Sequence, residues 1–341
     1  MKIEIINSKK FKNISDVIFS ETTDYQDFLN KNISESLYTI EDKSLNGSRF
    51  VTYINKSFNI SDGDIVFCQT DYVHYLFELL NNSDLNRIDL ITHQSDMKIT
   101  KKIYNQKPAC INYWYSTNVT AENKKLIPIP IGINNDFYQA FPIEEDFISK
   151  KFKKSYEKLD RYYLNFNVNT NFYHRLRILK KYSYQLNSSI SSRVNKEEYL
   201  EDLNQNKFII CPYGNGIDTH RVWEAIYANS YPVVQKSIAY KNFTDLPIIF
   251  VKNIATDDID LNIVRDINLE KANFSYWHNK ILSNKYIVQN IQEIPMSFNL
   301  DLFTAKEKKI RSRNSKNKRI KYFIFRVYKY FYLLIYRKTV I

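Results

Sequence analysis

The stretch "FIICPYGNGIDTHRVWEAIYANSYPVV", residues 208–234, carries the strongest pattern in the chain. A short apolar run opens it, Gly214 and Gly216 follow, and a helical pattern then leads to a second apolar run, "YPVV". The whole sequence holds five glycines, so two of them in one turn indicate a backbone that needs positive φ or a close approach. The pattern predicts a strand, a tight turn, a helix and a further strand of an α/β fold.

Polar and charged side chains at this turn predict an anion site. Open α/β sheets bind ligands at the carboxyl ends of their strands, where this turn would lie. Asp218 or Thr219 can cap the helix, whose free N–H groups attract anions. His220 and Arg221 add donors suited to a diphosphate, and Glu224 can accept hydrogen bonds from a ribose diol. The residues leave one alternative open, an ordinary turn with a surface ion pair between Arg221 and Glu224.

The same stretch resembles the nucleotide-sugar-binding motif of exostosin-like glycosyltransferases and of related bacterial enzymes that build surface polysaccharides. The family pattern is Cys/Ala-Pro-x-Gly-x-Gly, a few residues, Arg, x-x-Glu-Ala, small residues and Pro-Val-Val. The residues that match it in order are Pro212, Gly214, Gly216, Arg221, Glu224, Ala225, Pro232 and Val233. Asn229 replaces the usual glycine and tolerates the same left-handed conformation. The resemblance covers the second half of the chain and the first half only loosely.

The resemblance implies a GT-B-like α/β fold, with two Rossmann-like domains facing a central cleft. Arg221 would bind the diphosphate and Glu224 the ribose. The implied activity is that of a hexosyltransferase in surface polysaccharide synthesis, which moves a sugar from a nucleotide-sugar donor, a UDP-sugar by preference, to a glycan or lipid-linked acceptor. A fucosyltransferase-type enzyme that uses a GDP-sugar is one alternative, and a non-catalytic, membrane-attached sugar-binding protein is another.

A second motif, "YLNFNVNTNFYHRLRI" at residues 163–178, supports a donor site in the second half. It looks like the first strand, loop and helix of the same donor domain. Asn167 and Asn171 would supply polar contacts to the donor, and Arg175 would point to the same cleft. For Arg175 the alternative is a solvent-exposed base on a helix.

The first half of the chain should hold the acceptor and the base that activates it. "LITHQSD" places His93 and Asp96 just beyond a predicted strand end, and either side chain could deprotonate an attacking hydroxyl. A strand-end histidine and a helix cap are the structural alternatives. Trp114 could stack on an acceptor sugar or lie in the core. Arginines and helix ends can stabilise a leaving diphosphate, and no DxD motif follows an apolar strand, so we expect no metal and no cofactor beyond the nucleotide-sugar co-substrate.

Apolar runs alternate with helical segments along the chain and predict a largely parallel sheet. A charged stretch near residue 150 suggests a boundary between an acceptor-side domain, 1–150, and a nucleotide-sugar-binding domain, 151–305. The predicted helix spans 71–82. The predicted strands are 2–6, 64–69, 87–93, 126–132, 161–168, 207–211, 231–235 and 247–251.

The net charge of +12 lies wholly in the tail, residues 306–341, which holds thirteen Lys or Arg and one acid. Residues 1–305 are therefore neutral, which argues against a nucleic-acid-binding surface. Residues 320–341 are aromatic and basic and lack an uncharged run long enough to span a bilayer. They predict a helix on an anionic membrane surface, with docking on the N-terminal domain as the alternative.

The cysteines and the first residues of the chain predict where the protein acts. Three widely spaced cysteines suit neither a zinc site nor a disulfide framework and fit a reducing compartment. The first residues, "MKIEIINSKKF", show no apolar run of signal-peptide length, so we expect no signal peptide. Together with the basic tail, these features predict a cytoplasmic, peripheral protein on the inner face of the cell membrane.

Overall fold

The computed structural model describes residues 3–31, 36–45, 47–136, 138, 140–149, 157–191, 194–259, 268–288, 292–297, 299, 301, 303–304 and 326–327. The chain divides into two compact units, Met1–Met296 and Ser297–Ile341. Nearly all of the predicted tail lies outside the described residues, so its membrane association stays a prediction. In the part of the chain that the structure describes, every helix is too short or too polar to cross a membrane.

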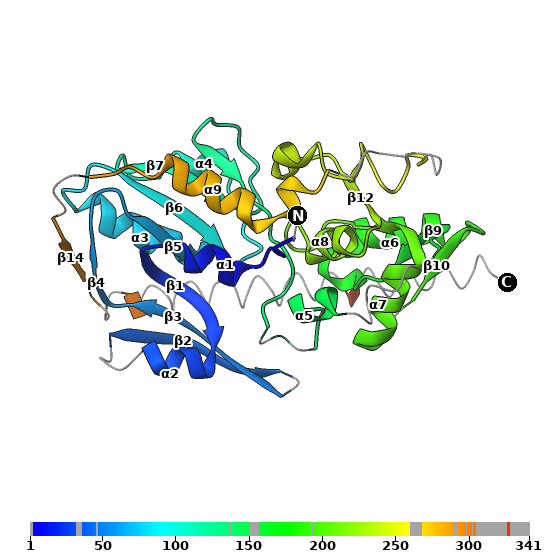
Figure 1. Cartoon of the computed structure of the whole chain (residues 1–341), viewed down its shortest axis with the longest axis horizontal. Coiled ribbons are helices and arrows are strands. Elements are labelled where there is room, and N and C mark those ends of the chain that lie inside the picture. The colour runs from blue at the N-terminus through cyan, green and yellow to red at the C-terminus, as the bar shows by residue number, and fades with distance from the viewer. Residues whose placement is uncertain are drawn as a thin grey trace. The chain divides into compact units, whose positions relative to one another are not determined.

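The first sheet has seven strands in the order β2-β3-β1-β5-β6-β7-β8 (Figure 1). Five of them run parallel, and the β2–β3 hairpin adds an antiparallel edge next to β1. Both faces of β5 and β6 are buried, which accounts for their nearly continuous apolar sequences. The strands are β1 (Val17–Asp24), β2 (Leu37–Leu45), β3 (Ser48–Asn55), β5 (Ile65–Gln69), β6 (Ile88–His93), β7 (Ile111–Ser116) and β8 (Leu126–Pro128).

Short helices accompany this sheet, and a separate pair of strands, β4 (Ser57–Ile60) and β14 (Ile294–Ser297), forms a two-stranded sheet. The helix α3 buries one face, which includes Tyr75, Leu76 and Leu80 at helical spacing. The helical segments are α1 (Ser8–Asn13), α2 (Tyr25–Lys31), η2 (Thr70–Tyr72), α3 (Val73–Asn81), α4 (Lys101–Tyr104) and α5 (Glu144–Ile148).

The second sheet has five parallel strands in the order β10-β9-β11-β12-β13 (Figure 1). Its strands are β9 (Leu159–Leu164), β10 (Ser188–Ile190), β11 (Asn206–Ile210), β12 (Tyr231–Gln235) and β13 (Ile249–Val251). The helical segments in this half are η3 (Val168–Asn171), α6 (Phe172–Tyr182), α7 (Lys196–Gln205), α8 (His220–Tyr227), η4 (Ile238–Phe243), η5 (Glu270–Ala272) and α9 (Phe274–Asn284). Two parallel sheets confirm the predicted mixed α/β class.

Most of the predicted elements are present, but the strand predicted at residues 2–6 is wrong. Residues 3–6 run outside both sheets, although Ile5 and Ile6 are buried. Single contacts, in place of a continuous strand ladder, bind this backbone. The Tyr227 hydroxyl and Asn273 Oδ1 accept from Ile6 N and Glu4 N, and the N–H groups of Ile133 and Phe274 donate to the carbonyls of Ile6 and Glu4. Burial of an apolar run therefore does not by itself make a strand. The sequence pattern also missed β1 and the β2–β3 hairpin, whose alternation of apolar and polar residues is weak.

One hydrophobic core joins the two sheets. It includes Phe67 and Ile91 of the first sheet, Ile209 of the second and Trp223 of α8, with the N-terminal segment between them. Helix α9 follows the second sheet in sequence but reaches the first, because Asn284 Nδ2 donates to the Tyr115 hydroxyl at 2.8 Å. Both sheets thus belong to one compact unit, and the division into domains at residue 150 stays a prediction. The three cysteines, Cys68, Cys110 and Cys211, are buried free thiols.

Gly132 offers a test of the contact that joins the N-terminal segment to this core. Its φ is +68°, and a Cβ there would overlap the carbonyl group of Ile6. We expect Gly132→Ala to lower the free energy of unfolding by about 3 kcal/mol or more, measured by urea denaturation. Gly47→Ala is the matched control, because Gly47 has φ +85° but open space around it. The control should cost about 1 kcal/mol, and equal losses in the two variants would contradict the packing argument.

Candidate functional site

The order of strands in the second sheet creates a place for a ligand. From β9 the chain crosses to β10 on one side, and from β11 it crosses to β12 on the other. The loops that follow β9 and β11, residues 165–171 and 211–219, therefore diverge at the carboxyl edge of the sheet. Such a switch point is where open α/β sheets bind ligands. The two motifs identified in the sequence occupy these two loops.

Arg175 of α6 fastens the two loops together. Its guanidinium donates to the carbonyl oxygens of Asn167 at 2.8 Å, Tyr213 at 2.9 Å and Pro212 at 3.1 Å. Burial, together with the positive charge of Arg221, lowers the pKa of Arg175 to about 10. The solvent-exposed alternative for Arg175 is thus wrong, since only 5% of the residue is exposed. Its predicted contact with a donor stays a prediction.

The two glycines of the motif serve close approach and not positive φ. Among the described glycines, positive φ occurs at Gly47, Gly63 and Gly132 but not at Gly214 or Gly216. A Cβ on Gly214 would lie 3.0 Å from Arg175 Nη2, and Asn171 Nδ2 donates to the Gly214 carbonyl at 3.4 Å. A Cβ on Gly216 would lie 2.9 Å from Asn118 Oδ1 and 3.0 Å from Asp96 Oδ1. The side chains of the neighbouring loops account for both glycines.

Helix α8 presents a cation, Arg221; burial acts to lower its pKa, but electrostatic interactions with Tyr199 and Glu224 raise it overall. Arg221 Nε is buried without a hydrogen-bond partner, and its guanidinium lies 5.9 Å above the Tyr199 ring. Glu224 is buried and accepts a 2.6 Å hydrogen bond from the Tyr199 hydroxyl. Among the described residues, neither a hydrogen bond nor an ion pair joins Arg221 to a carboxylate. The surface ion pair between Arg221 and Glu224, which was the alternative prediction, therefore does not form. Tyr199 of α7 had no signal in the sequence.

The ends of α8 follow the sequence only in part. At the N-terminus Thr219 is the capping residue, but its side chain makes no capping hydrogen bond and its Oγ1 is buried without a partner. At the C-terminus Asn229 has φ +57°, as the replacement of glycine predicted. The N–H groups of Asn229 and Ser230 bind the carbonyls of Ile226 and Ala225, which completes the left-handed cap.

Asn118 joins the loop at residues 211–219 to the first sheet. It lies two residues beyond β7 with φ +54°, is 1% exposed, and accepts at Oδ1 from Ile217 N at 2.7 Å and Asp218 N at 3.0 Å. Its Nδ2 donates to the Ser95 carbonyl at 3.1 Å. These buried hydrogen bonds to both loops hold Asn118 in its left-handed backbone conformation. Sequence analysis missed Asn118, and an asparagine directly after a buried strand was the available signal.

Asp218 makes a second connection, to the segment after β8. Its Oδ2 accepts from Ile131 N at 2.8 Å, and Trp223 Nε1 donates to both carboxylate oxygens at 3.0 and 3.1 Å. The residue is 2% exposed, and burial raises its pKa to about 7 against the hydrogen bonds that favour the carboxylate. Asp218 therefore joins loops and does not cap α8. Trp114, which the sequence suggested as a stacking surface for an acceptor sugar, is fully buried in the core.

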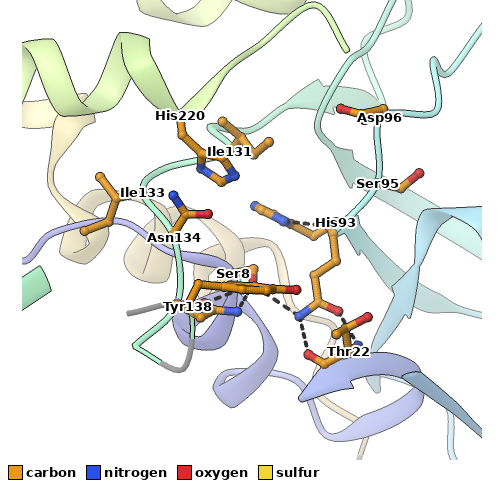
Figure 2. Close-up of a pocket in the computed structure, with 12 residues that line it drawn as sticks. Ser8, Thr22, His93, Ser95, Asp96, Ile131, Ile133, Asn134, Tyr138 and His220 are labelled. Carbon is orange, nitrogen blue, oxygen red and sulfur yellow. Dashed lines mark hydrogen bonds between the residues drawn. The ribbon is translucent and has the colours of Figure 1, made fainter. Parts of the chain in front are cut away.

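A cavity of about 230 Å³ with a mixed polar and apolar lining lies between the start of α8 and the segments at 93–96 and 131–135 (Figure 2). It contains both residues predicted to be catalytic, His93 and Asp96, together with His220. No lysine or arginine is found among its lining residues within the described chain. Hydroxyl and amide groups in the lining come from Ser8, Thr22, Gln94, Ser95, Asn134 and Asn135.

His93 is not suited to the base role predicted for it. Gln94 N donates to its Nδ1 at 2.8 Å, so the ring proton is on Nε2, which donates to the Pro130 carbonyl at 3.2 Å. Both ring nitrogens are thus engaged, and the side chain is 1% exposed. Burial lowers the pKa of His93 to about 3, which keeps the ring neutral. These contacts correct the sequence-based prediction in favour of the structural alternative.

Asp96 and His220 lie at the cavity with their functional groups less committed. Asp96 is exposed at the rim, and its carboxylate has neither a hydrogen bond nor an ion pair to any described residue. His220 Nδ1 lies 2.7 Å from the Gly132 carbonyl oxygen. Figure 2 shows His220 extending from α8 toward the space that His93 and Asp96 also border. At this cavity the structure therefore brings together His220 of the 208–234 motif and residues that follow strands of the first sheet.

Comparison with known proteins gives little further guidance. No protein-family model matches the chain, and no curated protein matches it. Among solved structures it is similar to the UDP-GlcNAc 2-epimerase from Methanocaldococcus jannaschii, with 10% identity and a TM-score of 0.31 over 64% of this chain and 75% of that chain. A similarity of this degree establishes neither a common fold nor a common activity.

The raised pKa of Asp218 predicts how stability depends on pH. The folded chain holds a proton up to about pH 7 that an unfolded aspartate releases near pH 4. The stabilisation from this group is fully present below about pH 4 and is lost as the pH rises toward about 7. The variant Asp218→Asn cannot titrate at this position. The difference in the free energy of unfolding, wild type minus variant, should therefore decrease as the pH rises across this interval. Urea denaturation at several pH values measures it, and a constant difference would contradict the raised pKa.

Proposed function

We propose that this chain is a metal-independent glycosyltransferase that moves a sugar from a nucleoside diphosphate sugar to a hydroxyl group of an acceptor. The observation that carries the proposal is Arg221, a half-buried cation whose Nε lacks a partner among the described residues. It lies close enough to Arg175 to lower the pKa of that residue. The two arginines repel each other, and the carboxylates of Glu224 and Asp96 offset this only in part. A diphosphate would relieve the rest and accept the hydrogen bonds that Arg221 leaves unused.

The surroundings of Arg221 support a nucleotide more than a simple anion. Glu224, one turn along α8, is held by Tyr199 in a fixed position, and a carboxylate so placed can accept hydrogen bonds from a ribose diol. The motif that contains both residues resembles that of exostosin-like glycosyltransferases. We propose the same roles here: Arg221 on the diphosphate, where its charge would stabilise the leaving group, and Glu224 on the ribose.

The cavity supports a neutral, hydroxyl-rich acceptor. Its lining offers amides and hydroxyls, and the Asn134 side chain has no partner among the described residues. Asp96 would repel a phosphate placed there, and no lysine or arginine of the described lining would offset that repulsion. Asp96 lines the cavity and also interacts electrostatically with Arg175, so the proposed donor and acceptor sites adjoin. The predicted tail, residues 306–341, would hold such an enzyme at an anionic membrane.

Arg221→Ala tests the donor site. We expect the variant to bind UDP or GDP about 10- to 100-fold more weakly than the wild type, because it loses charge-assisted hydrogen bonds to the diphosphate. Isothermal titration with UDP, GDP and CMP measures the affinity, and Arg177→Ala, an exposed arginine of α6, is the matched control. Equal nucleotide binding by wild type and Arg221→Ala, or none by either, would overturn the proposal.

The same titrations separate the alternatives. Tighter binding of GDP than UDP would favour a fucosyltransferase-type enzyme. Nucleotide binding without sugar transfer to any of a panel of mono- and oligosaccharides would favour a non-catalytic sugar-binding protein. Transfer that persists in EDTA would agree with diphosphate stabilisation by arginines, whereas loss of transfer restored by Mg²⁺ would contradict the metal-independent form of the proposal.

A further inference from the structure

His220 differs from the other histidine of the cavity in its hydrogen bonds. A carbonyl oxygen can only accept, so the 2.7 Å contact between Nδ1 and the Gly132 oxygen fixes the proton of the neutral ring on Nδ1. The lone pair is then on Nε2. That atom has no hydrogen-bond partner among the described residues and is not one of the buried unpaired atoms. His220 is therefore an oriented proton acceptor at the cavity.

The position of His220 is fixed from both sides. It is the first residue of α8, directly before the proposed diphosphate ligand Arg221. Its Gly132 partner belongs to the segment that Asp218 holds through Ile131. Gly132 is itself confined, because its Cβ position is occupied by the Ile6 backbone. The imidazole therefore has a rigid support at Nδ1, as a base that must be aimed at a reacting atom requires.

We infer that His220 is the catalytic base, which accepts the proton of the acceptor hydroxyl at Nε2 as that hydroxyl attacks the donor sugar. This rests on the proposed function. In the step, the acceptor oxygen forms a bond to the anomeric carbon, and the bond from that carbon to the diphosphate oxygen breaks. The leaving nucleoside diphosphate takes the electron pair, and the proton moves to His220. Attack of this kind inverts the anomeric configuration, so the product should carry the opposite anomer to the donor.

The other ionisable groups of the cavity leave few alternatives to His220 as a base. The titratable residues that line the cavity with it are His93, Asp96 and Tyr138. Burial lowers the pKa of His93 to about 3 and raises that of Tyr138 to about 12, so neither competes for a proton near neutral pH. Among these residues, Asp96 is therefore the alternative that the experiment has to separate from His220.

His220→Asn is the direct test. The Asn Nδ2 can replace Nδ1 as donor to the Gly132 oxygen, but the variant has no basic nitrogen. We expect kcat/KM for transfer to fall about 100- to 10,000-fold and the affinity for UDP or GDP to change little. Release of nucleoside diphosphate from UDP- and GDP-hexoses, with a panel of mono- and oligosaccharide acceptors, measures turnover. His278→Asn on α9, away from the cavity, is the matched control and should behave as wild type.

Other outcomes overturn the assignment in distinguishable ways. A wild type that binds no nucleotide and transfers no sugar refutes the proposed function and this inference with it. A wild type that transfers sugar while His220→Asn keeps its turnover refutes the inference alone. Loss of turnover in Asp96→Asn but not in His220→Asn would assign the base to Asp96. A product with retained anomeric configuration, determined from proton NMR coupling constants, would also refute the inference, because it excludes direct displacement by the activated hydroxyl.

A measurement that needs no substrate checks the chemical basis. Diethyl pyrocarbonate acylates neutral, accessible imidazole nitrogens. We expect mass spectrometry to find His220 modified and His93 unmodified, since both nitrogens of His93 are engaged. Modification of His93 before His220 would contradict the hydrogen-bond arrangement from which the inference starts.

Discussion

The buried hydrogen bonds of the loop at 216–218 are the constraint on which the rest of the site depends. Asn118 Oδ1 binds two successive N–H groups of this loop, and the Asp218 carboxylate binds the backbone of Ile131 in return. Each partner is buried, so breaking either connection would leave unpaired polar groups away from water at a cost of about 1–3 kcal/mol each. These contacts hold the N-terminus of α8 against the first sheet, which places His220 at the cavity.

Electrostatics around α8 follow from the same packing. Arg175 is used inside the protein, where it joins the two loops of the switch point by binding three carbonyl oxygens. Arg221 has no comparable partners, although it lies in the field of Arg175. The two arginines of the sequence motifs thus differ in their roles: one sets the shape of the loops, and the other retains binding capacity. Glu224 helps to keep Arg221 charged beside this second cation, and unused hydrogen-bond donors on a charged group are characteristic of ligand sites.

The sequence predicted the elements of the second sheet better than the geometry of the site. Apolar runs such as 207–211 became buried parallel strands because burial on both faces selects such runs. Residues 3–6 show the limit of that logic, since the same composition is buried there against side chains outside the sheets. The glycines show another limit: Gly214 and Gly216 were expected to supply positive φ or a close approach, and the structure shows only the close approach. Tyr199 carried no local signal, because its role depends on Glu224, 25 residues away in sequence. The role of Asn118 depends on Asp218, 100 residues away, so its position after a strand was only a weak indication.

The two histidines of the cavity show why residue type alone could not identify a base. His93 and His220 carry the same side chain and border the same space. At His93 the backbone N–H of Gln94 takes the lone pair of Nδ1, and the remaining N–H binds a carbonyl, so the ring has nothing left to accept a proton. At His220 a carbonyl takes the N–H, and the lone pair stays available. In this cavity, whether an imidazole can act as a base therefore depends on whether its backbone partner donates or accepts a hydrogen bond. At His220 the partner accepts, and its position follows from the path of the loop at 131–132, which Asp218 and Ile6 hold in place.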